Sequence, residues 1–195
     1  MAYYLNWNAV PNADRYEVAY SATATGEKTL LAASPIYATK ADLTEITETG
    51  TRYLFVRARG AGYTDSDWSA PFEFSLVGLS ASTSFCTISF APAAILKGAA
   101  YTATVTADEG YYIAGGGITV RMGGVDITSS AVSGGVITIP NVTGAVQISA
   151  TATAVALASP VITKSAGGGS ISWASVDGAD EYLIRADGVQ IDVST

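Results

Sequence analysis

The side chains of this chain that could do chemistry are few, and carboxylates are the main group among them. The sequence contains no histidine, so it lacks the commonest general base, metal ligand and triad member. Glycoside hydrolysis needs only two carboxylates, and Asp65 with Asp67, or Asp108 with Glu109, could supply them. Both pairs fall in turn-like segments with no sign of a cleft, which favours solvated loop charge. We therefore expect no enzyme activity and no catalytic residue.

Metal and phosphate sites have weak support in the sequence. Asp65-Ser66-Asp67 could offer oxygen ligands to Ca²⁺, but the further spaced acidic residues of a dedicated loop are missing. The glycine runs at 115–117 and 167–169 lack the lysine and helix of a phosphate loop. Cys86 is the only cysteine, and its apolar setting favours a small buried residue over a reactive thiol. We expect no cofactor and no metal.

Aromatic residues on the outer face of a strand are better functional candidates. Tyr53, Phe55 and Arg57 alternate with apolar residues, so they share one face of the strand, and Trp68 follows in a loop. Exposed rings can stack on sugars or anchor a protein contact. We predict Tyr53, Phe55, Arg57 and Trp68 as candidate surface contacts. The alternatives are that the rings pack on a neighbouring domain or under long side chains of an adjacent strand, and that Trp68 covers the end of the sandwich.

The elements that must position these residues are predicted to be strands. Apolar residues alternate with a period of two, and no sustained period of 3.6 occurs, over the segments 3–7, 16–20, 54–58 and 72–76. Gly123-Gly124 and Ser133-Gly134-Gly135 each interrupt a similar alternation and predict tight hairpins. The chain is therefore predicted to be all-β, with tandem antiparallel sandwiches.

A repeat joins the two ends of the chain. Five residues recur with the same spacing at an offset of 166 positions. They are Trp7, Val10, Ala13, Asp14 and Tyr16 in the first copy and Trp173, Val176, Ala179, Asp180 and Tyr182 in the second. One supersecondary unit used twice is typical of a tandem array.

The first unit resembles a fibronectin type III domain. The resemblance covers residues 1–77 and depends on the first copy of the repeat, then Asp42-Leu43, Val56-Arg57-Ala58 and Ser69-Ala70-Pro71. The resemblance implies strands B, C, E, F and G of a β-sandwich, with strand A missing. Arg52 stands where the family places an inward tyrosine, which puts the usual corner hydrogen bond in doubt.

The next two units carry two further resemblances. Residues 78–154 are similar to small Ig-like repeats of tail and surface proteins of phages of Gram-positive bacteria, and of bacterial surface proteins; the segments that carry the likeness are 123–128, 135–140, 142–144 and 148–152. Residues 155–195 again resemble fibronectin type III, with strands expected at 160–164, 170–174, 181–186 and 189–193 and a hairpin turn at Asp187-Gly188. This last unit stops before strands E, F and G.

Charge and hydropathy exclude two kinds of partner. The net charge is −7 and the ten basic residues are scattered, so we expect no nucleic-acid binding. Residues 127–163 carry no charge, but glycines and prolines interrupt them, so no membrane insertion is expected. Residues 1–20 lack the basic and apolar regions of a secretion signal.

The resemblances imply a non-catalytic structural or adhesion protein of a phage virion, in the tail, a fibre or the capsid surface, that acts as a modular spacer or display scaffold. The alternative is a bacterial cell-surface or secreted adhesin, or accessory modules of a glycan-degrading enzyme. Expected partners are other virion or cell-surface proteins, copies of the chain itself and cell-surface glycan, at a virion or extracellular location. The missing strand A suggests strand exchange between copies; the favoured alternative is that the chain is cut from a longer polypeptide.

Overall fold

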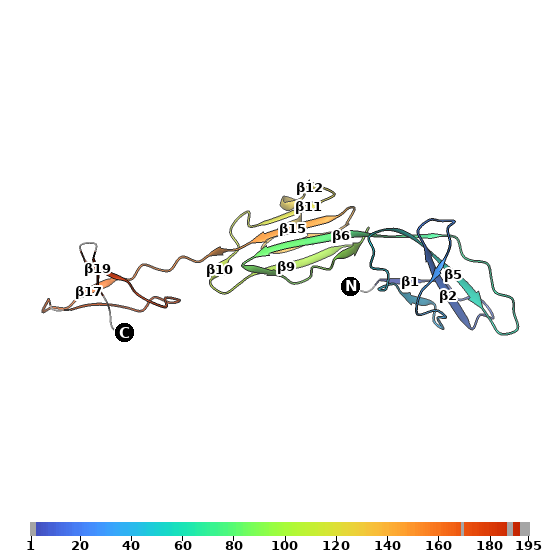
Figure 1. Ribbon diagram of the computed structural model, residues 1–195, viewed down its shortest axis with the longest axis horizontal. Coiled ribbons are helices and arrows are strands. Elements are labelled where there is room, and N and C mark those ends of the chain that lie inside the picture. The colour runs from blue at the N-terminus through green and yellow to red at the C-terminus, as the bar shows by residue number, and fades with distance from the viewer. Residues whose placement is uncertain (1–2, 169, 187–188, 192–195) are drawn as a thin grey trace.

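The protein is built almost wholly of β-strands, as the sequence predicts. The computed structural model describes residues 3–168, 170–186 and 189–191. Figure 1 shows three parts in a row: a first sandwich, a middle sandwich and a smaller C-terminal unit at the end of an extended linker. The described residues include one short helix, α1 (Thr128–Ala131), and no helix among them is long and apolar enough to cross a membrane.

The first sandwich closes a core between two sheets. Its strands are β1 (Tyr4–Asn6), β2 (Arg15–Ser21), β3 (Thr29–Leu30), β4 (Lys40–Asp42), β5 (Gly50–Arg59) and the first half of β6 (Phe72–Ser84). β1 pairs with β4 in one sheet, and β3, β2, β5 and β6 follow one another in the other. The buried residues between the sheets include Leu5, Val18, Leu31, Leu43, Leu54, Phe74 and Leu76. Apolar residues at alternate positions of the strands fill this core, as period-two patterning requires.

β6 is shared by the two sandwiches. Its first residues pair antiparallel with β5, whereas Leu79–Ser84 pair in parallel with β15 (Val146–Thr151). β8 (Ala94–Leu96) pairs with β6 at Leu76–Gly78, beside the crossing point. The boundary expected between residues 77 and 78 therefore falls inside a continuous strand.

The parallel pairing of β15 with β6 differs from the purely antiparallel sheets predicted. A parallel neighbour needs a long crossover connection. Here the chain between the two strands passes through strands of both sheets of the middle sandwich before β15 returns beside β6 in the same direction (Figure 1).

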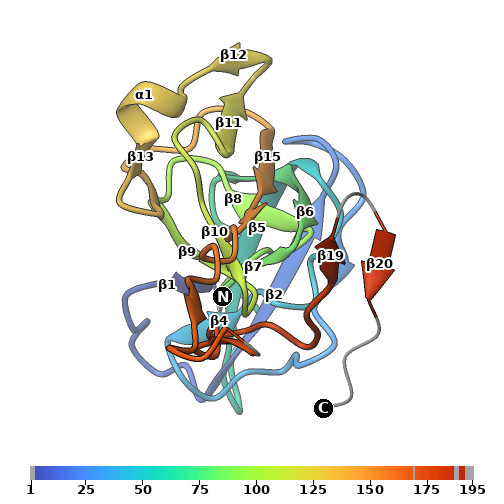
Figure 2. The same ribbon diagram turned by 90° about the vertical axis from the view of Figure 1, so that its left-hand side faces the viewer.

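The middle sandwich packs two sheets around a second core. Its further strands are β7 (Cys86–Ile88), β9 (Tyr101–Ala107), β10 (Tyr111–Tyr112), β11 (Ile118–Met122), β12 (Val125–Asp126), β13 (Val132–Ser133), β14 (Val136–Ile139) and β16 (Thr153–Ala154). One sheet runs β13-β14-β9-β7, and the other runs β12-β11-β15 onto β6. α1, β12 and β13 lie at one edge of this sandwich (Figure 2). Cys86 is buried in this core, as expected.

Both hairpins predicted from glycine pairs in the middle sandwich are confirmed. Gly123 and Gly124 have φ of 58° and 85° and join β11 to β12. Gly134 and Gly135 have φ of 55° and 79° and join β13 to β14. Positive φ at both central positions is the geometry that side chains disfavour and glycine allows, so the local sequence determines these turns.

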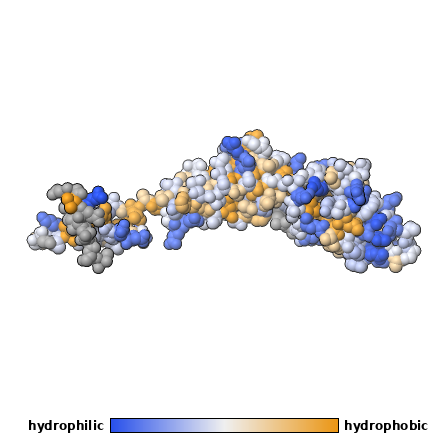
Figure 3. Space-filling view, viewed as in Figure 1, coloured by the Kyte–Doolittle hydropathy of each residue, from blue (hydrophilic) through white to orange (hydrophobic). Residues whose placement is uncertain are grey.

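The C-terminal unit consists of two hairpins. β17 (Ile162–Lys164) pairs with β18 (Ile171–Trp173), and β19 (Ile184–Ala186) pairs with β20 (Val189–Ile191). The turn expected at 187–188 and the end of the strand expected at 189–193 lie outside the described residues. Apolar side chains of this unit line an open cavity of about 420 Å³, and further apolar residues follow the linker (Figure 3). The unit therefore leaves apolar side chains such as Ile162 and Leu183 exposed.

The pattern that recurs at an offset of 166 positions also recurs in the structure, because both copies make the same hydrogen bond and the same aromatic contact. The hydroxyl of Tyr16 accepts the main-chain N–H of Val10 at 2.9 Å, and the hydroxyl of Tyr182 accepts that of Val176 at 2.5 Å. The preceding tryptophan packs against the tyrosine in each copy, with ring centroids 5.3 Å and 5.6 Å apart. The two copies therefore fold into the same local structure.

Candidate interaction site on the first sandwich

The candidate site lies on the outer face of β2 and β5. β2 is buried on both faces: Val18 points into the core, while Glu17 and Ala19 are covered on the opposite side. Glu17 is only 7% exposed, and it lies directly opposite Arg57 in the β2–β5 register. A buried carboxylate needs charged or hydrogen-bonding partners.

Two arginines of β5 supply these partners. Nε of Arg57 donates to Oε2 of Glu17 at 2.7 Å, and Nη1 of Arg59 donates to Oε1 at 2.5 Å. Arg59 also donates from Nε to Oδ1 of Asp65 at 2.9 Å. Both oxygens of Glu17 are thus satisfied, and the three strand residues form a cross-strand ion network that Asp65 extends.

The network keeps Glu17 ionised. Burial opposes ionisation of this carboxyl, but the hydrogen bonds and positive charges of Arg57 and Arg59 outweigh burial, so its pKa lies below the ordinary value of 4.5. A carboxyl that stays charged at neutral pH cannot donate a proton there. The geometry therefore suits Glu17 to a structural role.

The loop after β5 folds back along the edge of that strand. The hydroxyl of Ser66 accepts the N–H of Ala58 at 2.9 Å, and the hydroxyl of Ser69 accepts that of Val56 at 3.1 Å. In addition, the N–H of Ser66 donates to the carbonyl of Ala58 at 3.0 Å, and the N–H of Ser69 donates to the carbonyl of Val56 at 2.9 Å. These four bonds hold Trp68 at the β5 edge.

Arg57 and Trp68 come together in the structure. The guanidinium carbon of Arg57 lies 4.7 Å from the centre of the half-buried Trp68 ring. An arginine on an indole face forms a favourable cation–π contact. Trp68 therefore flanks the ion network, and together they form the part of the site that can meet a partner.

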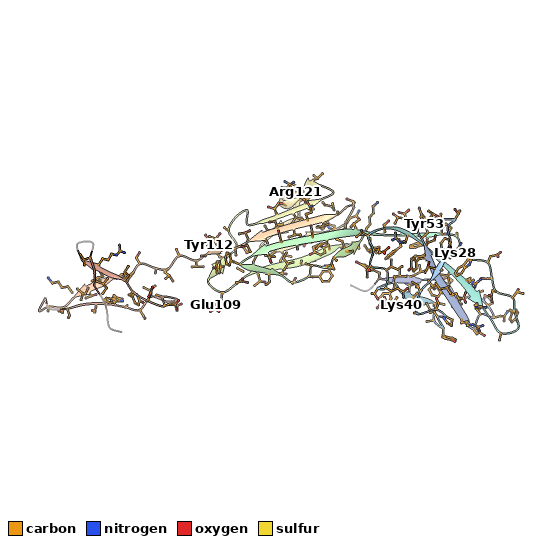
Figure 4. The ribbon with its side chains drawn as sticks, in the orientation of Figure 1. Lys28, Lys40, Tyr53, Glu109, Tyr112 and Arg121 are labelled. Carbon is orange, nitrogen blue, oxygen red and sulfur yellow. The ribbon has the colours of Figure 1, made fainter. Side chains whose placement is uncertain are left out.

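Phe55 differs from its prediction as an exposed ring. It lies on the outer face of β5 as expected, but it is only 3% exposed, and Nζ of Lys28 lies 4.4 Å from the ring centre. Lys28 precedes β3, which does not neighbour β5, so the cover comes from a loop side chain and not from the adjacent strand that the sequence analysis named. Tyr53 is half-buried near the start of β5; Figure 4 labels it and Lys28 on the first sandwich.

Glu17, Arg59 and Asp65 belong to the site but were not predicted from the sequence. A signal was present: Arg57 and Arg59 lie at alternate positions and so share one face of β5, and Glu17 is a charged residue between Tyr16 and Val18. Choosing the partner of Glu17 requires the β2–β5 register, which depends on residues 40 positions apart.

Within the described part of the chain, no group of three or more acidic or cysteine side chains is placed to hold a metal ion. The chain matches no protein-family model, and the curated proteins give no match to it. The interpretation of this surface therefore depends on its own geometry.

The Glu17 network predicts a pH-dependent stability. Because its folded pKa is depressed, Glu17 contributes stability above its unfolded pKa, near 4.5, and this contribution is lost as the pH falls through the folded value. We expect Glu17→Gln to lower the free energy of unfolding by about 1–2 kcal/mol at neutral pH, and by progressively less in acid. Urea titrations from neutral to acidic pH measure the difference.

The matched control is Glu48→Gln. Glu48 is an exposed carboxylate that pairs with Arg52, four residues along the chain. Exposed pairs of this kind are worth roughly 0.5 kcal/mol or less. An acid-sensitive loss as large as that of Glu17→Gln would contradict the special role of the buried carboxylate.

Proposed function

We propose that this chain is a non-catalytic structural or adhesion component of a phage virion, and that it acts as a modular spacer or display scaffold. The observation that carries the spacer role is the passage of β6 through both sandwiches. A spacer must transmit a fixed distance, and a shared strand gives less freedom than a flexible linker. The virion context follows from the resemblance of residues 78–154 to phage repeats.

Further bonds across the junction support stiffness. The hydroxyl of Tyr3 in the first sandwich accepts the N–H of Leu96 in β8 at 3.0 Å. The N–H of Lys97 donates to the carbonyl of Ser75 at 2.9 Å. Residues of the middle segment thus extend the sheet of the first sandwich, which resists bending at β6.

Adhesion is assigned to the outer face of the first sandwich. Trp68, Arg57 and the half-buried Tyr53 offer aromatic and charged surface to a protein or glycan. Weak contacts of this size gain strength from many copies, by roughly 10²- to 10⁴-fold. The alternative role, as a module of a bacterial adhesin or glycan-degrading enzyme, uses the same spacer geometry.

Location distinguishes the two roles. Antibodies against the chain, applied to lysates from induced cells, are expected to detect it in density-purified virions. Detection on the surface of uninduced cells, with none in virions, would support the bacterial alternative and overturn the virion assignment.

An insertion into β6 tests the spacer role. We expect Gly-Ser-Gly-Ser between Val77 and Gly78 to uncouple the two sandwiches, because it interrupts the β6–β8 pairing. Spin labels on cysteines at the exposed Ala22 and Val125, in a Cys86→Ala background, report the distance between the sandwiches. The distance distribution is narrow in the parent chain and broad in the variant.

The matched control inserts the same sequence between Leu157 and Ala158, in the exposed linker. This insertion leaves the distance between the two sandwiches unchanged. A broad distribution in the parent chain itself would exclude a rigid spacer.

A further inference from the structure

β1 has a strand partner on one side only among the described residues. It pairs with β4, and that pairing uses the carbonyl of Tyr3, which accepts from Leu43, and the N–H of Trp7, which donates to Thr39. Antiparallel ladders alternate, so the N–H and C=O groups of the intervening Tyr4 and Asn6 point to the opposite edge. In the part of the chain that the structure describes, neither residue makes a main-chain hydrogen bond at that edge.

Apolar surface lies open beside this edge. Phe72 alternates with Phe74 and Leu76 on the core face of β6, yet it is 60% exposed. A groove of about 380 Å³ runs between β1 and Phe72 and reaches Trp7. A second groove, of about 480 Å³, continues along β1 past Phe72 and includes Glu73. Among the described residues, the core of the first sandwich is thus uncovered along the same edge at which the main-chain groups of β1 have no strand partner.

The internal repeat shows which strand fits such an edge. β18 is the repeat copy of β1, since subtracting 166 converts Trp173 to Trp7 and Ser172 to Asn6. In the C-terminal unit, β17 covers β18 with Ile162 opposite Trp173 and Thr163 opposite Ser172. The edge that is open on β1 is the edge that β17 occupies on β18.

The hydrogen-bond directions agree in the two copies. The N–H of Ser165 donates to the carbonyl of Ser170 at 3.0 Å, so by alternation Ser172 also bonds toward β17. Ser170 and Ser172 correspond to Tyr4 and Asn6, the residues whose main-chain groups point to the open edge of β1. If β17 lies beside β1 in the same register, its main-chain N–H and C=O groups therefore face the C=O and N–H groups of Tyr4 and Asn6.

The side chains of β17 suit the grooves in that register. Residues directly opposite in an antiparallel pair share a face. Ile162 would lie opposite Trp7, at the smaller apolar groove, and Lys164 opposite Leu5, at the groove that contains Glu73. The strand brings one apolar side chain to the smaller apolar groove and one cation to a groove whose lining includes both Glu73 and Lys97.

β17 is weakly held where it is. Its hairpin has three residue pairs, and Ile162 is 64% exposed there. Little apolar burial is lost when it leaves β18, whereas Ile162 and Phe72 both lose exposed surface at β1.

We propose that β17 of a second copy of this chain adds antiparallel to the open edge of β1, which joins copies head to tail. The contact is heterologous: the donor surface is in the C-terminal unit and the acceptor surface is in the first sandwich. Such a contact leaves a free donor and a free acceptor at the two ends of every oligomer, so growth continues with concentration.

Sedimentation of the whole chain from about 10 µM to about 1 mM tests the proposal. Asn6→Pro removes an N–H on the open edge, where proline is tolerated, and Ile162→Asp brings a carboxylate to the apolar groove. We expect the parent chain to form oligomers whose mass rises with concentration, and each variant alone to associate roughly tenfold more weakly. Circular dichroism and thermal melting verify that both variants are folded; if Asn6→Pro melts early, Phe72→Asp replaces it.

Mixing the variants gives the sharper result. The Asn6→Pro chain keeps its donor strand and the Ile162→Asp chain keeps its acceptor edge, so an equimolar mixture is expected to stop at a dimer. A parent chain that stays monomeric at the highest concentration, a mixture that stays monomeric, or association that neither variant weakens would each overturn the proposal. Binding of a peptide of residues 158–165 to a chain that remains monomeric would mean that the edge accepts another segment, and the second copy would be excluded as its occupant.

Discussion

Replacing Val120 by aspartate is expected to unfold the middle sandwich and to lower the stability of the first sandwich as well. Val120 lies in β11 and is fully buried, opposite Ile148 of β15. A carboxylate at this position has no partner in the core, and the loss of stability is expected to be about 4 kcal/mol or more. β15 pairs with β6, so loss of the middle sandwich removes a neighbour from the strand that the first sandwich shares.

The tryptophans make this coupling measurable. Trp7 and Trp68 are in the first sandwich and Trp173 is in the C-terminal unit, so the middle sandwich contains no tryptophan. Circular dichroism reports the loss of strands in the whole chain, whereas tryptophan fluorescence reports the two outer parts. In the Val120→Asp variant we expect the fluorescence transition to shift to lower temperature.

Val125→Asp is the matched control. Val125 is on β12, across the same hairpin, but it is 65% exposed, so the same substitution is expected to change stability by about 0.5 kcal/mol or less. An unchanged fluorescence transition in the Val120→Asp variant would show that the sandwiches are stable independently, and would weaken the spacer proposal.

The local parts of the fold are predictable from the sequence, and the junction is not. Gly123-Gly124 determines a hairpin because its positive φ values concern only adjacent residues. The parallel pairing of Leu79–Ser84 with Val146–Thr151 joins segments far apart in the sequence. Period-two patterning gives each strand a core face but no partner. The shared strand therefore becomes visible only when the pairing is known.

The candidate site shows the same division. The alternation of side chains along β5 places Arg57 and Phe55 on the outer face, and the structure agrees. Exposure is decided by residues distant in sequence: Lys28 covers Phe55, and the loop after β5 brings Trp68 onto Arg57. The direction of a side chain follows from its own strand, whereas its accessibility depends on the rest of the fold.

Phe55→Ala is the second substitution for which we expect a large effect, and it separates a packing role from a contact role. The ring is on the outer face of β5 but is buried, beneath the ammonium group of Lys28. Its removal loses buried apolar area and the cation–π contact, and leaves a cavity on the outer face of the sheet beneath Lys28. We expect the free energy of unfolding to fall by about 2–4 kcal/mol, measured by urea denaturation of the whole chain.

Phe72→Ala is the control of the same chemistry. Phe72 is 60% exposed on the core face of β6, so the same truncation is expected to cost about 1 kcal/mol or less. A cost for Phe55→Ala as small as that for Phe72→Ala would mean that the Phe55 ring is uncovered in solution and available to a partner. The predicted order assigns a stabilising role to Phe55, which lies on the outer face of its strand but is covered. It leaves contact with a partner to Phe72, which lies on the core face of its strand beside the open edge of β1.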